Sequence, residues 1–398
     1  MEEKYFESLH QELKSQPRAI PFLLIDLDKL DQNIATLNSS IQPNIDFRIV
    51  VKSLPSPELI NYVMRKANTK KLMVFHQPFL SHLSKIQDNS VDILLGKPMP
   101  VKTAEFYYQT LKTLNGFSPT KQLQWLVDTT QRVEEYIFLA KKIKQKLRLN
   151  LEIDVGLRRG GFTKMADLRN ALHLIQSNLE QVEFSGFMGY DPHVVKLPKV
   201  IMSKEKALKK ANDFYGKCID LLKNEFPNLL HEHLIFNGAG SPTVELHQNK
   251  NTPLNDISAG SCLVKPTTFD IPTLGKYVPA SFIATPILKK MKGTTIPGIE
   301  KLKGLLNFLN KKNRQSYFIY GGFWKADYYY PKGVSENELY GSSTNQTMIN
   351  SASKKELQVD DFIFLRPHQS EFVFLQFGKI LTLRNGKADG EFSLLSQV

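Results

Sequence analysis

The chain has few of the features that mark secreted or membrane proteins. Its 398 residues include only two cysteines, Cys218 and Cys262, so a framework of disulfide bonds is not expected. No apolar run approaches the length of about 20 residues that a membrane-spanning helix needs. Residues 1–6 carry acidic side chains where a signal peptide carries basic ones, and no apolar segment follows them. These absences predict a cytoplasmic protein with no membrane contact.

The chain also lacks a concentrated basic surface motif. Its 52 lysines and arginines against 39 acidic residues give a net charge of +13, which would suit nucleic acid. The densest basic run, residues 141–148, nevertheless keeps apolar residues at helical spacing, as a solvated helix face does. No zinc knuckle or aromatic-basic motif accompanies this run. We therefore expect no nucleic-acid partner and interpret the charge as favouring solubility and small anionic molecules.

Short apolar runs alternate with amphipathic segments between about residues 21 and 243, which predicts an α/β fold. The apolar runs are residues 22–25, 47–51, 71–75, 91–95, 123–127, 151–155, 182–188 and 234–236. Their continuous apolar character is typical of parallel strands that are buried on both faces. Eight such units predict a (β/α)8 TIM barrel, and a doubly wound open sheet is the alternative architecture.

The pattern changes after about residue 253, where short strand-like runs replace the alternation. These runs are residues 281–287, 317–320, 361–365, 372–377 and 380–383. Between them lie a basic, partly helical insertion at residues 289–314 and a polar, loop-rich stretch at 328–350. We expect three parts: an N-terminal segment over residues 1–20 that packs on either domain, a barrel over 21–250, and a β-rich C-terminal domain over 251–398.

Lys52 directly follows the predicted strand at residues 47–51. Active sites of TIM barrels lie at the carboxyl ends of the strands, and Lys52 is at such an end. An amine that is partly desolvated there favours the neutral form, which attacks a carbonyl group. The alternative is an ordinary lysine whose ammonium group extends into water.

Three further motifs follow later predicted strands. Residues 154–162 place Arg158 and Arg159 among glycines, and residues 186–193 bring Tyr190 and His193 within one turn. Residues 237–243 form a Gly-rich turn with serine and threonine hydroxyls, which fits a monophosphate better than a Walker A loop or a dinucleotide fingerprint. Each motif is also compatible with a structural turn.

A strand-end lysine, an arginine, an aromatic ring and a monophosphate cradle are together typical of pyridoxal 5'-phosphate (PLP) sites. The chain resembles the fold type III PLP enzymes, which combine an alanine racemase N-terminal barrel with a β domain. Within that group it is most similar to the D-threonine aldolase and D-serine dehydratase family. The resemblance rests on the order and spacing of six stretches: residues 26–34, 48–52, 154–161, 189–193, 238–241 and 366–370.

The resemblance implies a role for each of these site residues. Lys52 would form the Schiff base with PLP, and Arg159 would face the pyridine nitrogen, which an arginine cannot protonate. Tyr190 and His193 would line the cofactor and the substrate. The phosphate would be held by three residues of the Gly-rich turn: Gly238, Gly240 and Ser241.

The implied function is that of a PLP-dependent lyase, an aldolase or a dehydratase, acting on D-configured β-hydroxy amino acids such as D-threonine or D-serine. Lys52 or His193 would move the proton, and the enzyme would be a homodimer. The alternatives are an amino-acid racemase of the alanine racemase type, which needs bases on both faces of the substrate, and a non-catalytic PLP-binding protein.

The second domain departs from the family pattern at its metal site. Family members carry a His-x-Cys or His-x-Asp pair that binds a divalent metal, whereas this chain has His368-Gln369-Ser370. A neutral serine hydroxyl is a poorer ligand for Zn²⁺ or Mn²⁺ than a thiolate or carboxylate. Three outcomes stay open: weak metal binding through His368, a substitute ligand such as Glu371, or no metal at all.

Overall fold

The computed structural model describes residues 2–111, 115–198, 200–248, 251–291, 293–294, 298, 315–353 and 356–397. The chain divides into two compact units. One, which we call the barrel unit, contains Ile34–Cys262, Ile271–Lys276 and Leu395–Val398. The other, the sheet unit, contains Met1–Asn33, Leu263–Asp270 and Tyr277–Leu394. No helix within the described ranges is long and apolar enough to cross a membrane, and both cysteines are buried.

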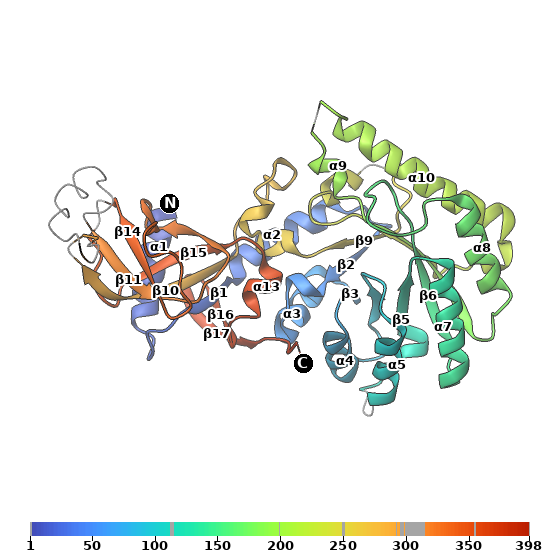
Figure 1. Ribbon diagram of the computed structural model, residues 1–398, viewed down its shortest axis with the longest axis horizontal. Helices are drawn as coiled ribbons and strands as arrows, with labels where there is room; N and C mark the ends of the chain where they lie inside the picture. Colours follow the sequence, from blue (N-terminus) through green and yellow to red (C-terminus); the bar gives the residue numbers. More distant parts are fainter. Residues whose placement is uncertain are drawn as a thin grey trace. The chain divides into compact units, whose positions relative to one another are not determined.

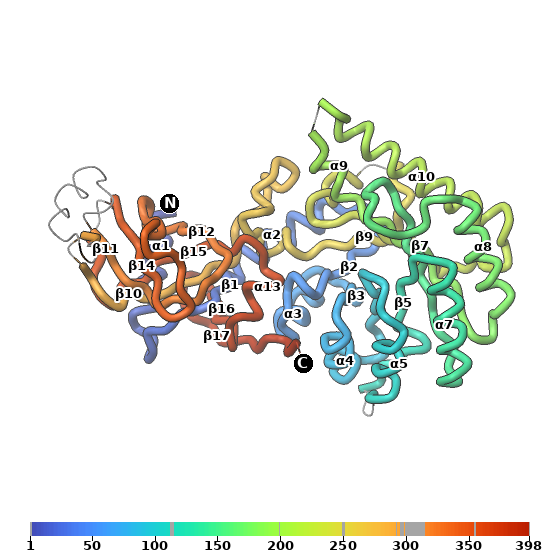
Figure 2. Tube along the Cα trace, viewed as in Figure 1, coloured from blue at the N-terminus to red at the C-terminus, as the bar shows by residue number. Residues whose placement is uncertain are grey.

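The barrel unit contains a closed ring of eight parallel strands (Figures 1 and 2). The strands are β2 (Asp46–Val50), β3 (Lys71–Val74), β4 (Asp92–Leu95), β5 (Leu123–Val127), β6 (Leu147–Glu152), β7 (Val182–Gly189), β8 (Ile235–Gly238) and β9 (Asp256–Ala259). The predicted TIM barrel is therefore confirmed, and the open sheet is excluded because β9 pairs with β2 and closes the ring.

Helices alternate with these strands along the chain (Figure 1). The longer ones are α2 (Leu27–Ser40), α3 (Pro57–Ala67), α4 (Gln77–Ile86), α5 (Val101–Thr110), α7 (Thr130–Ile143), α8 (Met165–Gln176) and α10 (Lys204–Glu225). Shorter ones are α6 (Pro119–Gln122), α9 (His193–Lys196) and α11 (Ser261–Val264). Local signals set their ends: in α3 the Ser56 hydroxyl caps the amide of Leu59, Pro57 occupies the first turn, and Asn68 ends the helix in the left-handed conformation.

The assignment of strands to the barrel is wrong at two places. Residues 22–25 form β1 (Phe22–Asp26), but this strand pairs with β10 and β16 in the sheet unit and not with the barrel. The eighth barrel strand is instead β9, which the apolar pattern does not reveal because Asp256 and Ser258 interrupt it. The strand predicted at residues 151–155 in fact begins at Leu147. The apolar pattern misses its first half because the buried polar residues Arg148 and Asn150 interrupt the apolar run.

The amino end of the barrel is closed by buried ion pairs. Arg48 is fully buried, and its guanidinium donates to both oxygens of Asp256 at 2.9 and 3.0 Å and contacts Asp92 Oδ1 at 2.7 Å. Burial by itself lowers the pKa of Arg48, but the two carboxylates outweigh it and raise the pKa above its usual value. Arg148 adds contacts to Asp92 at 3.4 Å and to Glu183 at 3.1 Å. Each buried arginine is thus paired with carboxylates within the barrel.

The sheet unit is built on a nine-stranded sheet with the order β13-β14-β11-β10-β1-β16-β17, in which β15 pairs with β10 and β12. Its other strands are β10 (Ser281–Met291), β11 (Ser316–Tyr320), β12 (Ala326–Tyr330), β13 (Val334–Glu336), β14 (Gln346–Ser351), β15 (Phe362–Pro367), β16 (Lys379–Arg384) and β17 (Lys387–Ser393). The N-terminal helix α1 (Glu2–Lys14) packs Phe6, Leu9 and Leu13 into the core of this sheet. Full burial of such side chains contributes about 1.5–3 kcal/mol each.

Three details of the sheet unit differ from the sequence pattern. The strand predicted at residues 372–377 is wrong, because Ser370–Phe374 form the short helix α13. The stretch 328–350, predicted as loop, contains most of β12 and all of β13, and β14 begins within it. Of the insertion predicted at residues 289–314, positions 289–291 end strand β10. Its positions 292, 295–297 and 299–314 lie outside the described residues.

Candidate cofactor site at the carboxyl end of the barrel

Lys52 lies at the carboxyl end of β2, in a short 3-10 turn over Val51–Ser53. The turn is closed by a 3.0 Å hydrogen bond from the Leu54 amide to the Val51 carbonyl. The Lys52 side chain is half-buried, and its Nζ lies 4.7 Å from the centre of the Phe75 ring, which follows the neighbouring strand β3. The amine is thus held against an aromatic face at the mouth of the barrel.

The Gly-rich turn after β8 meets the turn after β9. The Ser241 hydroxyl accepts hydrogen bonds from the backbone amides of Gly260 at 3.2 Å and Cys262 at 3.0 Å. Gly260 packs so closely on β2 that a Cβ there would lie 2.8 Å from the Val50 carbonyl oxygen. The hydroxyls of Ser53 and Ser261 lie 2.9 Å apart. Two amides and a hydroxyl therefore converge beside the turn that carries Lys52, in a pattern typical of a phosphate cradle.

Tyr190 stands between the Gly-rich turn and Arg159. Its ring lies against Gly240, where a Cβ would come within 2.5 Å of Cε2, so a larger residue there would have to displace the ring. The guanidinium carbon of Arg159 lies 5.0 Å from the centre of the same ring. A Cβ at Gly238 would meet the end of the Leu254 side chain at 2.7 Å, so a larger residue there would have to displace that side chain. Arg159, Tyr190 and the predicted phosphate turn are thus brought together.

His193 begins helix α9, directly after the turn that follows β7. Its ring packs against Gly156, where a Cβ would lie 2.8 Å from Nε2. Its Nδ1 atom is buried and has no hydrogen-bond partner among the described residues. Burial lowers the pKa of His193, although Asp191 and Asp154 act in the opposite direction. The imidazole is therefore neutral at neutral pH and can accept a proton.

Asp191, Thr243 and His247 form a buried group that the sequence motifs did not identify as a unit. The Asp191 carboxylate accepts the Thr243 hydroxyl at 2.6 Å and contacts His247 Nε2 at 2.8 Å. All three side chains are at least nine-tenths buried. Residues 186–193 and 237–243 were recognised separately, but His247 lies 56 residues after Asp191, and nothing in the sequence pattern links them.

Glu152 is a second residue that the sequence analysis missed. It ends strand β6, in phase with Arg148 and Asn150, whose side chains make contacts inside the barrel, so strand alternation places it on the inner face. Burial, followed by the nearby carboxylates of Asp128 and Asp154, raises the pKa of Glu152 to about 7, and Arg159 opposes this effect. A carboxyl group that titrates near neutral pH therefore lies at the same end of the barrel as Lys52.

His368 and Ser370 belong to the sheet unit. His368 Nε2 lies 2.9 Å from Asp327 Oδ1, and its backbone carbonyl accepts hydrogen bonds from Thr268. Ser370 Oγ is buried in α13 and has no hydrogen-bond partner within the described ranges. No group of three or more histidine, cysteine, aspartate or glutamate side chains that could hold a metal occurs among the described residues. These two residues thus do not fit the expected metal-binding pair.

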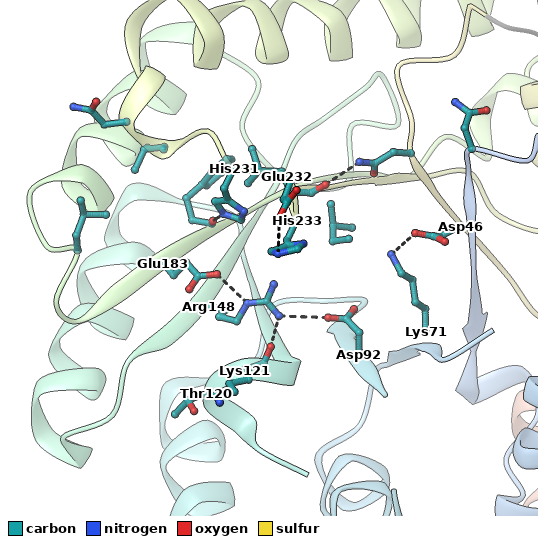
Figure 3. Close-up of a pocket in the computed structure, with 18 residues that line it drawn as sticks. Asp46, Lys71, Asp92, Thr120, Lys121, Arg148, Glu183, His231, Glu232 and His233 are labelled. Atoms are coloured by element: carbon teal, nitrogen blue, oxygen red, sulfur yellow. Dashed lines mark hydrogen bonds and ion pairs between the residues drawn. The ribbon is translucent and has the colours of Figure 1, made fainter. Parts of the chain in front are cut away.

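A pocket of about 820 Å³ opens at the opposite, amino end of the barrel (Figure 3). Figure 3 shows Arg148 directed toward Glu183 and Asp92, and Lys71 toward Asp46. The charged groups that line it are largely engaged with one another, and the active sites of this fold lie at the other end of the barrel. We therefore interpret this pocket as part of the structural closure of the barrel.

The comparisons with known proteins agree with this architecture. The chain is similar over 95–96% of its length to the solved structures of three enzymes. D-threonine aldolase from Filomicrobium marinum has a TM-score of 0.71 at 13% identity, with 98% of that chain covered. D-threo-3-hydroxyaspartate dehydratase from Delftia sp. HT23 has a TM-score of 0.73 at 12% identity, with 99% covered. Alanine racemase from Clostridium difficile 630 has a TM-score of 0.67 at 14% identity, with 99% covered.

At such identities these likenesses show the fold. A comparison with curated protein sequences finds no match. The family model described as "Alanine racemase, N-terminal domain" matches residues 25–267, which is more than half of the chain and contains every barrel strand. The chain therefore belongs to the alanine racemase N-terminal domain family.

Proposed function

We propose that this protein is a PLP-dependent lyase, an aldolase or dehydratase, that acts on D-configured β-hydroxy amino acids. The observation that carries the proposal is the meeting of the Lys52 turn with the Ser241 cradle at one end of the barrel. Two of the similar solved structures are a D-threonine aldolase and a D-threo-3-hydroxyaspartate dehydratase, which supports this reaction class.

The residues at this end of the barrel fit the cofactor. When bound, PLP supplies an aldehyde that an amine attacks and a conjugated ring that withdraws electrons from the α-carbon of an amino acid. Lys52 provides the amine. The Ser241 hydroxyl, which accepts the amides of Gly260 and Cys262, has its own proton to donate to a phosphate. Gly240 leaves room for the Tyr190 ring at the edge of this cradle.

Two side chains are suited to act on the substrate. The neutral imidazole of His193 accepts a proton, and its buried Nδ1 atom, which no described residue engages, needs a hydrogen-bond partner that a bound substrate can supply. Arg159 is held over the Tyr190 ring and offers a fixed positive charge at the cofactor. Lys52 is another group at this end of the barrel that can move a proton.

The metal of the related enzymes does not enter this proposal, because His368 and Ser370 do not fit it. His368 Nε2 is engaged by Asp327, and the Ser370 hydroxyl is buried inside α13. We expect Ser370→Cys to raise the affinity for Zn²⁺ only if its thiolate reaches a metal held by His368. Titration calorimetry of wild type, Ser370→Cys and His368→Ala with Zn²⁺ measures this directly. Tight binding by wild type that His368→Ala removes would contradict our interpretation of the two residues.

The cofactor assignment is tested by borohydride reduction. Wild-type protein incubated with PLP and then reduced should carry a stable pyridoxyl group on the peptide that contains Lys52, located by mass spectrometry. Lys52→Ala should carry none, whereas Lys70→Ala, which removes an exposed lysine before β3, should be labelled like wild type. A wild-type protein that takes up no PLP would overturn the proposal.

The reaction is tested by a panel of D-amino acids that carry a β-hydroxyl group. Release of glycine and an aldehyde would identify an aldolase, and release of a keto acid and ammonia would identify a dehydratase. Interconversion of enantiomers without cleavage would replace the lyase by a racemase. Bound PLP with no turnover of any substrate in the panel would favour a non-catalytic PLP-binding protein.

A further inference from the structure

The turn between β7 and α9 and the turn after β8 are joined by one buried carboxylate. We propose that Asp191 is a positioning residue that couples phosphate binding at the Gly-rich turn to the placement of Tyr190 and His193. This inference rests on the proposed function and deepens it, because it assigns the coupling inside that site to the buried residues Asp191, Thr243 and His247.

Both oxygens of Asp191 are engaged. The Thr243 hydroxyl donates to Oδ1 at 2.6 Å, and His247 Nε2 lies 2.8 Å from Oδ2. His247 is itself held by Thr252, whose Oγ1 lies 2.9 Å from Nδ1. The exposed fractions are 3% for Asp191, 0% for Thr243 and 3% for His247. A carboxylate buried to this degree is stable only with such partners, so the arrangement is well defined.

This connection joins the turn that carries Tyr190 and His193 to the Gly-rich turn after β8. Asp191 lies between Tyr190 and His193, and its carbonyl accepts the Val194 amide at 3.1 Å in the first turn of α9. Thr243 closes the Gly-rich turn, because its amide and that of Val244 both donate to the Gly240 carbonyl at 2.9 Å. A displacement of the Gly-rich turn is therefore transmitted through Thr243 and Asp191 to the turn that carries His193.

This connection predicts a difference between PLP and pyridoxal. PLP would use the Gly-rich turn through its phosphate, so a loosened turn should weaken PLP binding much more than the binding of pyridoxal, which has no phosphate. In metal sites, replacing the groups that orient a ligand from behind typically changes affinity 10–100-fold, and we expect an effect of similar size here. Binding and positioning must also influence each other equally, because such coupling is reciprocal.

The test is equilibrium binding of PLP and of pyridoxal to the full chain. Asp191→Asn keeps the shape of the side chain but removes its charge, and Thr243→Val removes the hydroxyl in a nearly equal volume. We expect each variant to weaken PLP binding roughly 10-fold or more while pyridoxal affinity changes by less than about twofold. Thr69→Val is the matched control, because Thr69 is a buried threonine bonded to the Phe47 carbonyl at the other end of the barrel. Thermal unfolding of every variant checks that it is folded.

A second measurement tests the coupling with inorganic phosphate, which lacks the aldehyde of PLP. Inorganic phosphate added to the cofactor-free wild-type protein should shift the ring resonances of His193, and this shift should be lost in Asp191→Asn. Equal weakening of PLP and pyridoxal binding, or no change in either, would overturn the inference while leaving the proposed function intact. Failure of wild type to bind PLP at all would overturn both.

Discussion

The two ends of the barrel differ in how their polar and charged side chains are paired. At the amino end, Arg48 and Arg148 are matched by the carboxylates of Asp92, Asp256 and Glu183. At the carboxyl end, His193 has a buried nitrogen that no described residue satisfies, and burial raises the pKa of Glu152 to about 7. The first arrangement favours stability, and the second leaves groups available for chemistry.

Local sequence reflects this difference. The charged residues at the amino end stand at or near the first positions of their strands, where they point inward and meet one another. The residues at the carboxyl end stand in turns rich in glycine, where the backbone comes close to aromatic rings and to the neighbouring strand. The same eight strands thus carry two separable functions, and substitutions at each end should have different consequences.

Arg48→Met should have the largest effect on folding. It removes the fully buried guanidinium and leaves the Asp256 carboxylate buried with fewer partners. Loss of one member of a buried ion pair typically costs about 3–5 kcal/mol of unfolding free energy. Urea unfolding of wild type and variant measures the difference. A variant as stable as wild type would show that the amino end is not a structural closure.

His193→Gln should separate activity from stability. The glutamine keeps a polar side chain but cannot accept and release a proton, so kcat should fall roughly 10²-fold, the lower end of a general acid–base contribution. The free energy of unfolding should stay close to that of wild type, because Nδ1 makes no hydrogen bond with the described residues. Steady-state kinetics on the substrate identified by the panel, with unfolding curves in parallel, checks both. Unchanged kcat would remove His193 from the mechanism.

Glu152→Gln should stabilise the protein at alkaline pH. The folded protein holds a proton on Glu152 up to about pH 7, whereas the unfolded chain releases it near pH 4.5. The stability contributed by this group is therefore complete below pH 4.5 and declines as the pH rises through 7. The glutamine variant avoids that decline, so its Tm at pH 8 should exceed that of wild type by several degrees.

This prediction is tested by comparing the Tm values of wild type and Glu152→Gln at pH 8 and at pH 4.5. At pH 4.5 the Tm values of wild type and Glu152→Gln should coincide, because Glu152 is then protonated in the folded protein. A constant offset at both pH values would contradict the assignment of the raised pKa. It would indicate instead that the amide makes a better hydrogen bond than the acid.

Asp46→Asn should have the smallest effect. Its carboxylate contacts Lys71 at 2.6 Å, but the Asp46 side chain is 63% exposed, so water screens the pair. Exposed pairs of this kind contribute about 0–1 kcal/mol. A loss of stability comparable with that of Arg48→Met would show that the ion pairs at the rim and inside the barrel act as one unit.

The sequence pattern predicted those strands whose residues are apolar on both sides. The barrel strands at 71–75, 91–95 and 123–127 agree closely with β3, β4 and β5. The pattern failed where polar residues point inward: Asp256 and Ser258 in β9 accept hydrogen bonds inside the barrel, so this strand has no continuous apolar run. Conversely, β1 is apolar and buried, but its partners are strands that lie more than 250 residues later in the chain.

For the candidate site too, the sequence predicted local motifs but not the contacts between distant segments. Lys52, Tyr190, Arg159 and the Gly-rich turn were recognisable because each lies in a short motif directly after a strand. The contacts among them, such as the Ser241 hydroxyl with the Gly260 amide, join segments that only the closed ring brings together. Glu152 gave no signal, because a single acidic residue at a strand end is unremarkable until its neighbours are known.

The discontinuous sheet unit has a consequence for synthesis on the ribosome. Its first 33 residues emerge before the barrel, but their partners β10, β15 and β16 are made only after residue 280. The apolar face of α1, with Phe6, Leu9 and Leu13, therefore has no native core to join while the barrel is translated. Contacts between residues far apart in the sequence form slowly. Apolar surface that stays exposed during this time promotes aggregation. The nascent chain should need protection of its N-terminal helix until the last strands appear.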